Sequence, residues 1–335
     1  MPGSSVELER PIGDAISRVR FAPRSGNLLI SSWDSILRLY DVDASEIRLE
    51  AASEGALLDC CFHDEWVAFS SSSDYRIRRY DLPSGKQEVM GKHDDVATCV
   101  DYSEETGQLI SAGLDKKLML WDIHATNRKS GSLEMDTEVT SLSLCGYYIV
   151  VAVGTLTNVY DSRSLKGALQ SEGSSMDYQL SCVRSLSKNE GFVVGSVDGR
   201  VALKFLEASR PREMGCIFHC HPRSMDRRRH LVTINDIAVH PLHDTFVTGD
   251  NEGYAIIWDA QSKKRLFEFP RHINSVASLS YNHSGQKLAI ACSHTYQNAN
   301  EMEETRQILI HEVDNLRKPL LVVCRVAHYS KSEVN

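Results

Sequence analysis

The feature that most constrains the fold of this 335-residue chain is an internal repeat of about 40 residues. Four early segments end in an aromatic residue followed by Asp, and these aspartates are 40, 41 and 39 residues apart. They are Asp41, Asp81, Asp122 and Asp161. The next clear ending, Trp258-Asp259, comes 98 residues later, which leaves room for two repeats and roughly 18 extra residues. With a last repeat ending near Ile308–Glu312, the count is seven.

Each repeat consists of short alternating apolar and polar segments separated by turn residues, and no long window has a period of 3.6 residues. A period near 40 with four strands per unit and an aromatic-Asp ending is typical of WD-repeat β-propellers. We therefore expect an all-β, seven-bladed WD-repeat propeller over residues 1–335. Its blades should end near residues 41, 81, 122, 161, 205, 259 and 312, with an insertion at 208–230 and a C-terminal tail at 313–335.

A propeller usually completes its last blade with a strand from the other terminus. Two segments are candidates for that strand: Val6–Arg10 near the N-terminus and Leu320–Cys324 near the C-terminus. The first is slightly favoured.

The composition narrows the class of partner. The formal net charge of −8 argues against a general nucleic-acid binder or a polybasic membrane binder. The nine cysteines form no C-x-x-C pair and most stand in apolar segments, which favours a reduced intracellular protein. No secretory signal is apparent, and the longest apolar run, Tyr147–Val153, is far shorter than the ~20 residues of a membrane span.

No motif for nucleophilic catalysis or nucleotide binding is present, so we expect no enzymatic activity and no cofactor. The segment Cys216–His221 has a metal-like composition but lacks a second ligand pair, so no metal site is expected. The WD-repeat pattern that the third repeat resembles joins four side chains in one buried hydrogen-bond network. Here they are His93, Ser111, Asp115 and Trp121, which we interpret as structural rather than as a hydrolase triad.

The insertion is basic against an acidic background. It carries six arginines between Arg210 and His230, among them Arg223. It is either a solvated loop or a docking site for an acidic or phosphorylated peptide, because guanidinium groups match carboxylate and phosphate oxygens.

Several segments go further and resemble one family, the small WD-repeat spindle-checkpoint Bub proteins. The first repeat, Ser31–Asp41, looks like that of the family, and the run Leu58–Asp64, with its Asp-Cys-Cys-Phe-His-Asp core, is the most specific match. Weaker matches are Tyr178-Gln179, Cys182–Arg184, Asp198–Ala202, Cys220-His221 and Lys263–Leu266.

The resemblance implies a non-catalytic scaffold of the mitotic spindle checkpoint. Such proteins bind an acidic motif, called GLEBS, in checkpoint kinases and Mad-like partners, and they also read phosphorylated Met-Glu-Leu-Thr repeats on a kinetochore scaffold. By the same resemblance, Trp33 is an apolar anchor, Arg200 pairs with acidic residues, and Arg184 and Arg223 are further basic candidates. The implied location is the nucleus and the mitotic kinetochore, with a cytoplasmic pool, and no direct contact with nucleic acid or membrane.

Two departures from the family pattern bear on phosphopeptide reading. The third repeat has Leu114 where the family has Trp, and the insertion has His219–Arg223 where the family reads Lys-Cys-His-Arg. The chain therefore looks like a diverged member, expected to read phosphothreonine poorly. Two alternative functions stay open: an mRNA-export adaptor at the nuclear pore, and a substrate receptor of a cullin ubiquitin ligase, for which Tyr160–Arg163 is a weak indication.

Overall fold

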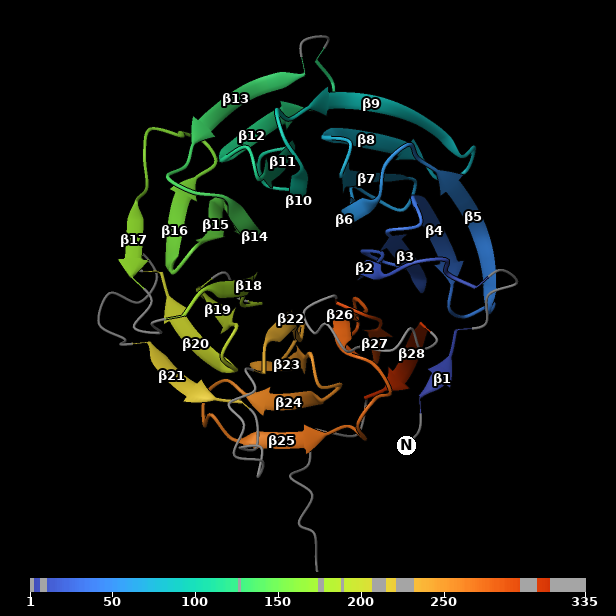
Figure 1. Cartoon of the computed structure of the whole chain (residues 1–335), viewed down its shortest axis with the longest axis vertical. Helices are drawn as coiled ribbons and strands as arrows, with labels where there is room; N and C mark the ends of the chain where they lie inside the picture. The colour runs from blue at the N-terminus through green and yellow to red at the C-terminus, as the bar shows by residue number, and fades with distance from the viewer. Residues whose placement is uncertain are drawn as a thin grey trace, which may run out of the picture.

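The computed structural model describes residues 3–6, 11–125, 128–173, 178–187, 190–206, 215–220, 232–295 and 306–313. Within these ranges the chain forms 28 strands and no helix. The strands build seven four-stranded antiparallel sheets arranged around a central channel, as Figure 1 shows. The predicted all-β, seven-bladed propeller is thereby confirmed.

Each blade runs outward from the channel, one strand after another. The innermost strands are β2 (Ile16–Phe21), β6 (Leu57–Phe62), β10 (Ala97–Ser103), β14 (Val139–Cys145), β18 (Leu180–Ser185), β22 (Ile234–Val239) and β26 (Val276–Tyr281). The second strands are β3 (Asn27–Ser32), β7 (Val67–Ser72), β11 (Gln108–Gly113), β15 (Tyr148–Val153), β19 (Gly191–Ser196), β23 (Thr245–Asp250) and β27 (Lys287–Cys292).

The third strands carry the aromatic-Asp endings where these are present. They are β4 (Ile36–Asp41), β8 (Arg76–Asp81), β12 (Lys117–Asp122), β16 (Leu156–Asp161), β20 (Arg200–Phe205), β24 (Ala255–Asp259) and β28 (Gln307–Glu312). The outer strands are β5 (Glu46–Ala52), β9 (Lys86–Lys92), β13 (Lys129–Glu134), β17 (Gln170–Gly173), β21 (Cys216–His219), β25 (Arg265–Glu268) and β1 (Ser4–Ser5). We number the blades 1 to 7 from the one that contains β2 to the one that contains β26.

The N-terminal segment closes the ring. In blade 7, β1 pairs with β28, so that Ser4 lies opposite Ile310, and the Val6 N–H donates to the Ile308 carbonyl at 2.9 Å. This pairing begins two residues before the predicted strand Val6–Arg10. Residues 7–10 and the competing segment 320–324 lie outside the described residues.

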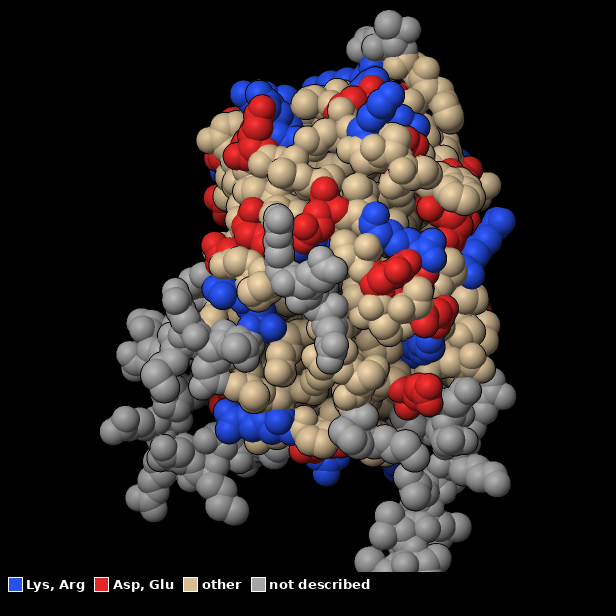
Figure 2. All heavy atoms as spheres, turned by 90° about the vertical axis from the view of Figure 1, so that its right-hand side faces the viewer, with Lys and Arg blue, Asp and Glu red and all other residues tan. Residues whose placement is uncertain are grey.

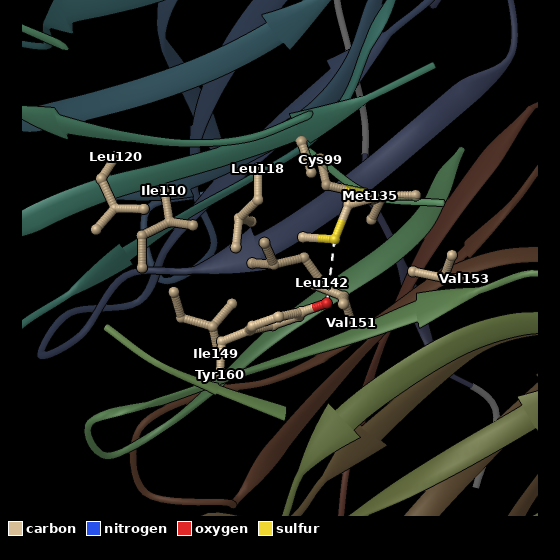
Figure 3. Close-up of a cluster of buried hydrophobic side chains, with 12 residues drawn as sticks. Cys99, Ile110, Leu118, Leu120, Met135, Leu142, Ile149, Val151, Val153 and Tyr160 are labelled. Carbon is tan, nitrogen blue, oxygen red and sulfur yellow. Dashed lines mark hydrogen bonds between the residues drawn. The ribbon is translucent and has the colours of Figure 1, made fainter. Parts of the chain in front are cut away.

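The hydrophobic core is divided among the seven junctions between neighbouring blades, each with its own cluster of buried side chains in the described part of the chain. Figure 3 shows the cluster between blades 3 and 4, where Leu118 and Met135 face Leu142 and Tyr160. The Tyr160 hydroxyl donates to the Met135 sulfur at 3.3 Å. Full burial of one such side chain stabilises the fold by roughly 1.5–3 kcal/mol, so every blade depends on both neighbours.

Some backbone N–H groups on the free edges of the innermost strands donate to side chains of the preceding blade. A register shift, the sign of a β-bulge, follows the first residue of the innermost strand in all seven blades. In blade 2 the residue after the bulge, Asp59, accepts the Val100 N–H of blade 3 at 3.2 Å. In blade 4 the Ser141 hydroxyl oxygen accepts the Val183 N–H of blade 5 at 3.1 Å. These contacts leave fewer unpaired amides along the channel.

Candidate functional site

The ring has two faces, defined by the strand connections. The upper face carries the turns between second and third strands, and the lower face carries the turns between first and second strands. Trp33 lies in the upper turn of blade 1, between β3 and β4, and its side chain is 39% exposed. The backbone N–H of Trp33 donates to the Ala15 carbonyl at 2.8 Å, which anchors the turn to the start of the same blade.

The turn that presents Trp33 is fixed by a partly buried ion pair. Arg38, only 2% exposed, donates from Nη2 to Asp34 Oδ2 at 2.7 Å and from Nη1 to Asp34 Oδ1 at 3.1 Å. Burial opposes ionisation of the Asp34 carboxyl, but hydrogen bonds from Arg38 and Ser32 outweigh it and lower the pKa of Asp34. Because its neighbour in sequence is held by two charge-assisted bonds, the Trp33 ring projects from a rigid backbone.

Arg200 is the first residue of β20, directly after the equivalent upper turn of blade 5. Its Nε–H donates to Asp198 Oδ2 at 2.5 Å, and its guanidinium lies over the Tyr178 ring, 5.3 Å from the centroid. The side chain retains 19% exposure. The ring and the carboxylate orient the guanidinium on the upper face, the same face as Trp33.

Arg184 lies elsewhere than the resemblance implies. It is 6% exposed and extends from β18 into the channel, where its Nη2 donates to Asp236 Oδ1 at 2.6 Å. Burial lowers the pKa of Arg184, and Asp236 opposes that shift. Its charge is thus neutralised inside the fold, and we leave it out of the proposed partner surface.

Arg184 belongs to an ion-pair network that crosses the channel. Arg18 of blade 1 donates from Nε to Asp59 of blade 2 at 2.9 Å, and its Nη1 lies 3.0 Å from Asp236 of blade 6. Asp236 is fully buried. Four blades are therefore tied together through two carboxylates and two guanidinium groups, a feature that the sequence analysis missed.

The predicted network of the third repeat comes together in blade 3. The Trp121 indole N–H donates to Ser111 Oγ at 2.8 Å, Ser111 lies 2.7 Å from His93 Nε2, and His93 Nδ1 lies 2.9 Å from Asp115 Oδ2. Burial lowers the pKa of His93 and outweighs the opposing effect of Asp115. The ring is therefore neutral, with Nδ1–H facing the carboxylate. Ser111 has no exposed surface and cannot reach a substrate.

Blades 1 and 2 hold their upper turns with arginine instead of histidine. In blade 2, Arg78 donates to Ser72 Oγ at 2.8 Å and to Asp74 Oδ1 at 3.0 Å, the arrangement that Arg38 makes in blade 1. The sequence signal was the repeated pattern Ser-x-Asp-x-x-x-Arg, which starts at Ser32 and at Ser72. Burial opposes ionisation of Asp74, but the Arg78 hydrogen bond prevails and lowers the pKa of Asp74 to about 2.

The structure also bears on Leu114, the basic insertion and the expected absence of metal and membrane sites. Leu114 is 39% exposed in the upper turn of blade 3. Arg223 and most of the basic insertion lie outside the described residues. Within the described ranges, no group of three or more His, Cys, Asp or Glu side chains could hold a metal ion, and no helix there is long and apolar enough to cross a membrane.

Comparison with known proteins supplies the relationships. The family model "WD domain, G-beta repeat" matches residues 86–122 and 224–259. The chain is 47% identical to "Mitotic checkpoint protein BUB3.3" of Arabidopsis thaliana, over 93% of this chain and 100% of that protein. It is 37% identical to "Mitotic checkpoint protein BUB3.1" of the same plant, over 94% of each. The solved "Structure of U3-55K" has the same fold, with a TM-score of 0.80 and 17% identity over 93% of this chain and 98% of that one.

Proposed function

Because the chain belongs to the Bub3 family of WD-repeat mitotic checkpoint proteins, a family of scaffold type, we propose that it binds the acidic GLEBS-type motif of a checkpoint kinase or Mad-like partner. Binding would help to recruit that partner to kinetochores. The protein would act in the nucleus and at mitotic kinetochores, with a cytoplasmic pool and without direct contact to nucleic acid or membrane.

The observation that carries this proposal is the exposed Trp33 on its rigid upper turn. Trp is among the residues that most often dominate the binding energy of protein interfaces. The Asp34–Arg38 pair holds the turn in place before a partner arrives. The turn would therefore lose little conformational freedom on binding.

Arg200 supplies the charge that an acidic motif needs. Asp198 occupies its Nε–H, and Tyr178 supports the guanidinium from one side. A partner carboxylate would add a charge-assisted hydrogen bond, worth roughly 1.5–3 kcal/mol when shielded from water. An apolar anchor and a cation on one face fit a peptide that carries both apolar and acidic residues.

Calorimetric titration of an acidic GLEBS-type peptide tests the proposal. Trp33→Ala should weaken binding about 30-fold, corresponding to about 2 kcal/mol, without lowering the unfolding temperature. Arg200→Ala should weaken it about tenfold. Trp66→Ala, at an exposed tryptophan on the lower face, is the matched control and should bind as the wild type does. Equal affinity for wild type and Trp33→Ala would contradict the proposal.

A second titration addresses phosphopeptide reading. Since Leu114 stands exposed where the resembled family has Trp, we expect weak binding of a phosphorylated Met-Glu-Leu-Thr peptide and stronger binding by Leu114→Trp. Tight binding by the wild type would show that the aromatic is not needed.

Co-purification from mitotic cells distinguishes the alternative functions, because nucleoporins would indicate an export adaptor and a cullin adaptor would indicate a ligase receptor.

A further inference from the structure

The lower face carries an exposed tryptophan that the proposed function does not use. Trp66 lies in the turn between β6 and β7, and its side chain is 65% exposed. Two backbone groups of Trp66 fix the turn. Its backbone N–H donates to Asp64 Oδ1 at 2.8 Å, and its backbone carbonyl accepts the Leu82 N–H at 2.7 Å. The indole is therefore presented to solvent from a defined backbone.

Several exposed or half-buried tyrosines of this protein already have a cation from the same chain over the ring. The pairs are Tyr75 with Lys92, Tyr147 with Arg163, Tyr178 with Arg200 and Tyr254 with Arg271, at 4.6–5.6 Å from the ring centroid. Trp66 has no such cation within the described ranges. Because Trp is the best ring for cation–π contact, its face is available to a cation from another molecule.

Carboxylates lie on the turn of Trp66 and on the neighbouring turn of blade 3. Asp64 and Glu65 precede Trp66, and Glu104 and Glu105 lie in the corresponding turn of blade 3. The two turns lie side by side, since the His63 and Tyr102 rings are in edge contact with centroids 4.5 Å apart. Burial and the charges of Glu104 and Asp64 raise the pKa of Tyr102.

Two of these carboxylates are uncompensated. Glu104 and Glu105 are exposed and form no ion pair with any residue that the structure describes. Asp64 and Glu65 are partly used: Asp64 Oδ2 lies 2.9 Å from His63 Nδ1, and Glu65 accepts hydrogen bonds from the backbone N–H of Arg24 and the Ser25 hydroxyl. We call the set Asp64, Glu65, Trp66, Glu104 and Glu105 the lower acidic patch.

We propose that the lower acidic patch docks a basic segment of a partner protein, with one Lys or Arg side chain over Trp66 and others paired with the flanking carboxylates. Charge complementarity selects this occupant, since a nucleic acid or an anionic membrane would be repelled. Antiparallel strands place this turn at the opposite end of the ring from the turns of Trp33 and Arg200. Both faces can therefore be occupied at once.

Fluorescence anisotropy with a labelled octapeptide of alternating Arg and Gly tests the proposal on the full chain. Wild type should bind it saturably and should not bind the matching Glu-Gly peptide. Trp66→Ala should weaken binding about fivefold, the loss of one exposed cation–π contact. The double variant Glu104→Gln/Glu105→Gln should weaken it by a similar factor at low salt, and this difference should shrink in 0.5 M salt.

Matched controls separate this site from the overall negative charge. Leu242→Ala removes a side chain that is 61% exposed on the lower turn of blade 6, and Glu138→Gln removes an exposed charge on the upper face. Both should bind the basic peptide as the wild type does. The proposal is overturned if wild type does not saturate, if Trp66→Ala binds like Leu242→Ala, or if Glu138→Gln loses as much as the double variant. Trp33→Ala should leave this affinity unchanged, which separates this test from that of the proposed function.

Discussion

Asp236 is the residue whose charge should matter most for stability. It is fully buried and accepts from Arg184 at 2.6 Å, from the Ser278 hydroxyl at 2.9 Å and from the Leu279 N–H at 2.9 Å, with Arg18 3.0 Å away. Burial opposes its ionisation, but the charges of Arg184 and Arg18 lower the pKa of Asp236 from 3.8 to about 2. That fall corresponds to about 2 kcal/mol of stability at neutral pH.

Asp236→Asn should cost more than this, because it also leaves the buried Arg184 guanidinium without its carboxylate and removes one of the two carboxylates that pair with Arg18. Breaking a buried pair from one side typically costs about 3–5 kcal/mol. Urea unfolding followed by tryptophan fluorescence at pH 7 should show a clearly lower midpoint for the variant. Glu54→Gln is the control, since Glu54 is 73% exposed beside Arg76 and a surface pair contributes about 0–1 kcal/mol.

The same variant carries a pH signature. The pKa of Asp236 is depressed in the folded state, so its charge stabilises the protein fully above about pH 4 and this stability is lost as the pH falls toward 2. The difference between wild type and Asp236→Asn should therefore narrow as the pH is lowered from 5 to 3. A variant that unfolds with the midpoint of Glu54→Gln at pH 7 would refute the reasoning.

The remaining predictions concern other buried groups. Arg38→Ala should destabilise the fold by about 1.5–3 kcal/mol, because the partly buried Asp34 loses its charge-assisted hydrogen bonds. Arg79→Ala, at a 35% exposed side chain, should cost under about 1 kcal/mol in the same urea titration. Burial depresses the pKa of His93, so the stability that neutral His93 contributes is fully present above about pH 6.5 and is lost as the pH falls below that value. Between pH 7.5 and 5.5 the unfolding temperature of His93→Gln should therefore drop less than that of wild type. Burial raises the pKa of Cys60 to about 12, so a thiol reagent at pH 8 should label it only after urea is added.

The fold could be predicted because its signal is repeated. A period of about 40 residues and the aromatic-Asp endings recur along the chain, and each copy reinforces the same count. The hydrogen-bond network around His93 was equally readable, since its residue types stand at the spacing of the resembled repeat. Ring closure was only half readable, because a two-residue strand such as Ser4–Ser5 has no pattern of its own.

The charged channel could not be predicted in the same way. Arg18, Asp59 and Asp236 are separated by 41 and 177 residues, and only closure of the ring brings them together. Arg184 is a partner-binding candidate only by the family resemblance, and the structure shows that its strand turns the guanidinium inward to Asp236. A one-residue bulge sets which side chains face the channel, and the alternation of apolar and polar residues does not reveal it.

The Arg38 and Arg78 pairs lie between these two cases. The pattern Ser-x-Asp-x-x-x-Arg is visible twice in the sequence, but only the structure shows that the arginine replaces a histidine as partner of the turn aspartate. Repetition of a motif at equivalent positions was the available signal.

Hydrogen–deuterium exchange in the presence of an acidic GLEBS-type peptide tests the central claim, recognition through the upper face, most directly. The account predicts slower exchange at residues 31–36 and 196–201, which hold Trp33 and Arg200, and unchanged exchange at residues 63–67 around Trp66. Protection confined to residues 63–67 or to the outer strands, with the upper turns unaffected, would contradict it.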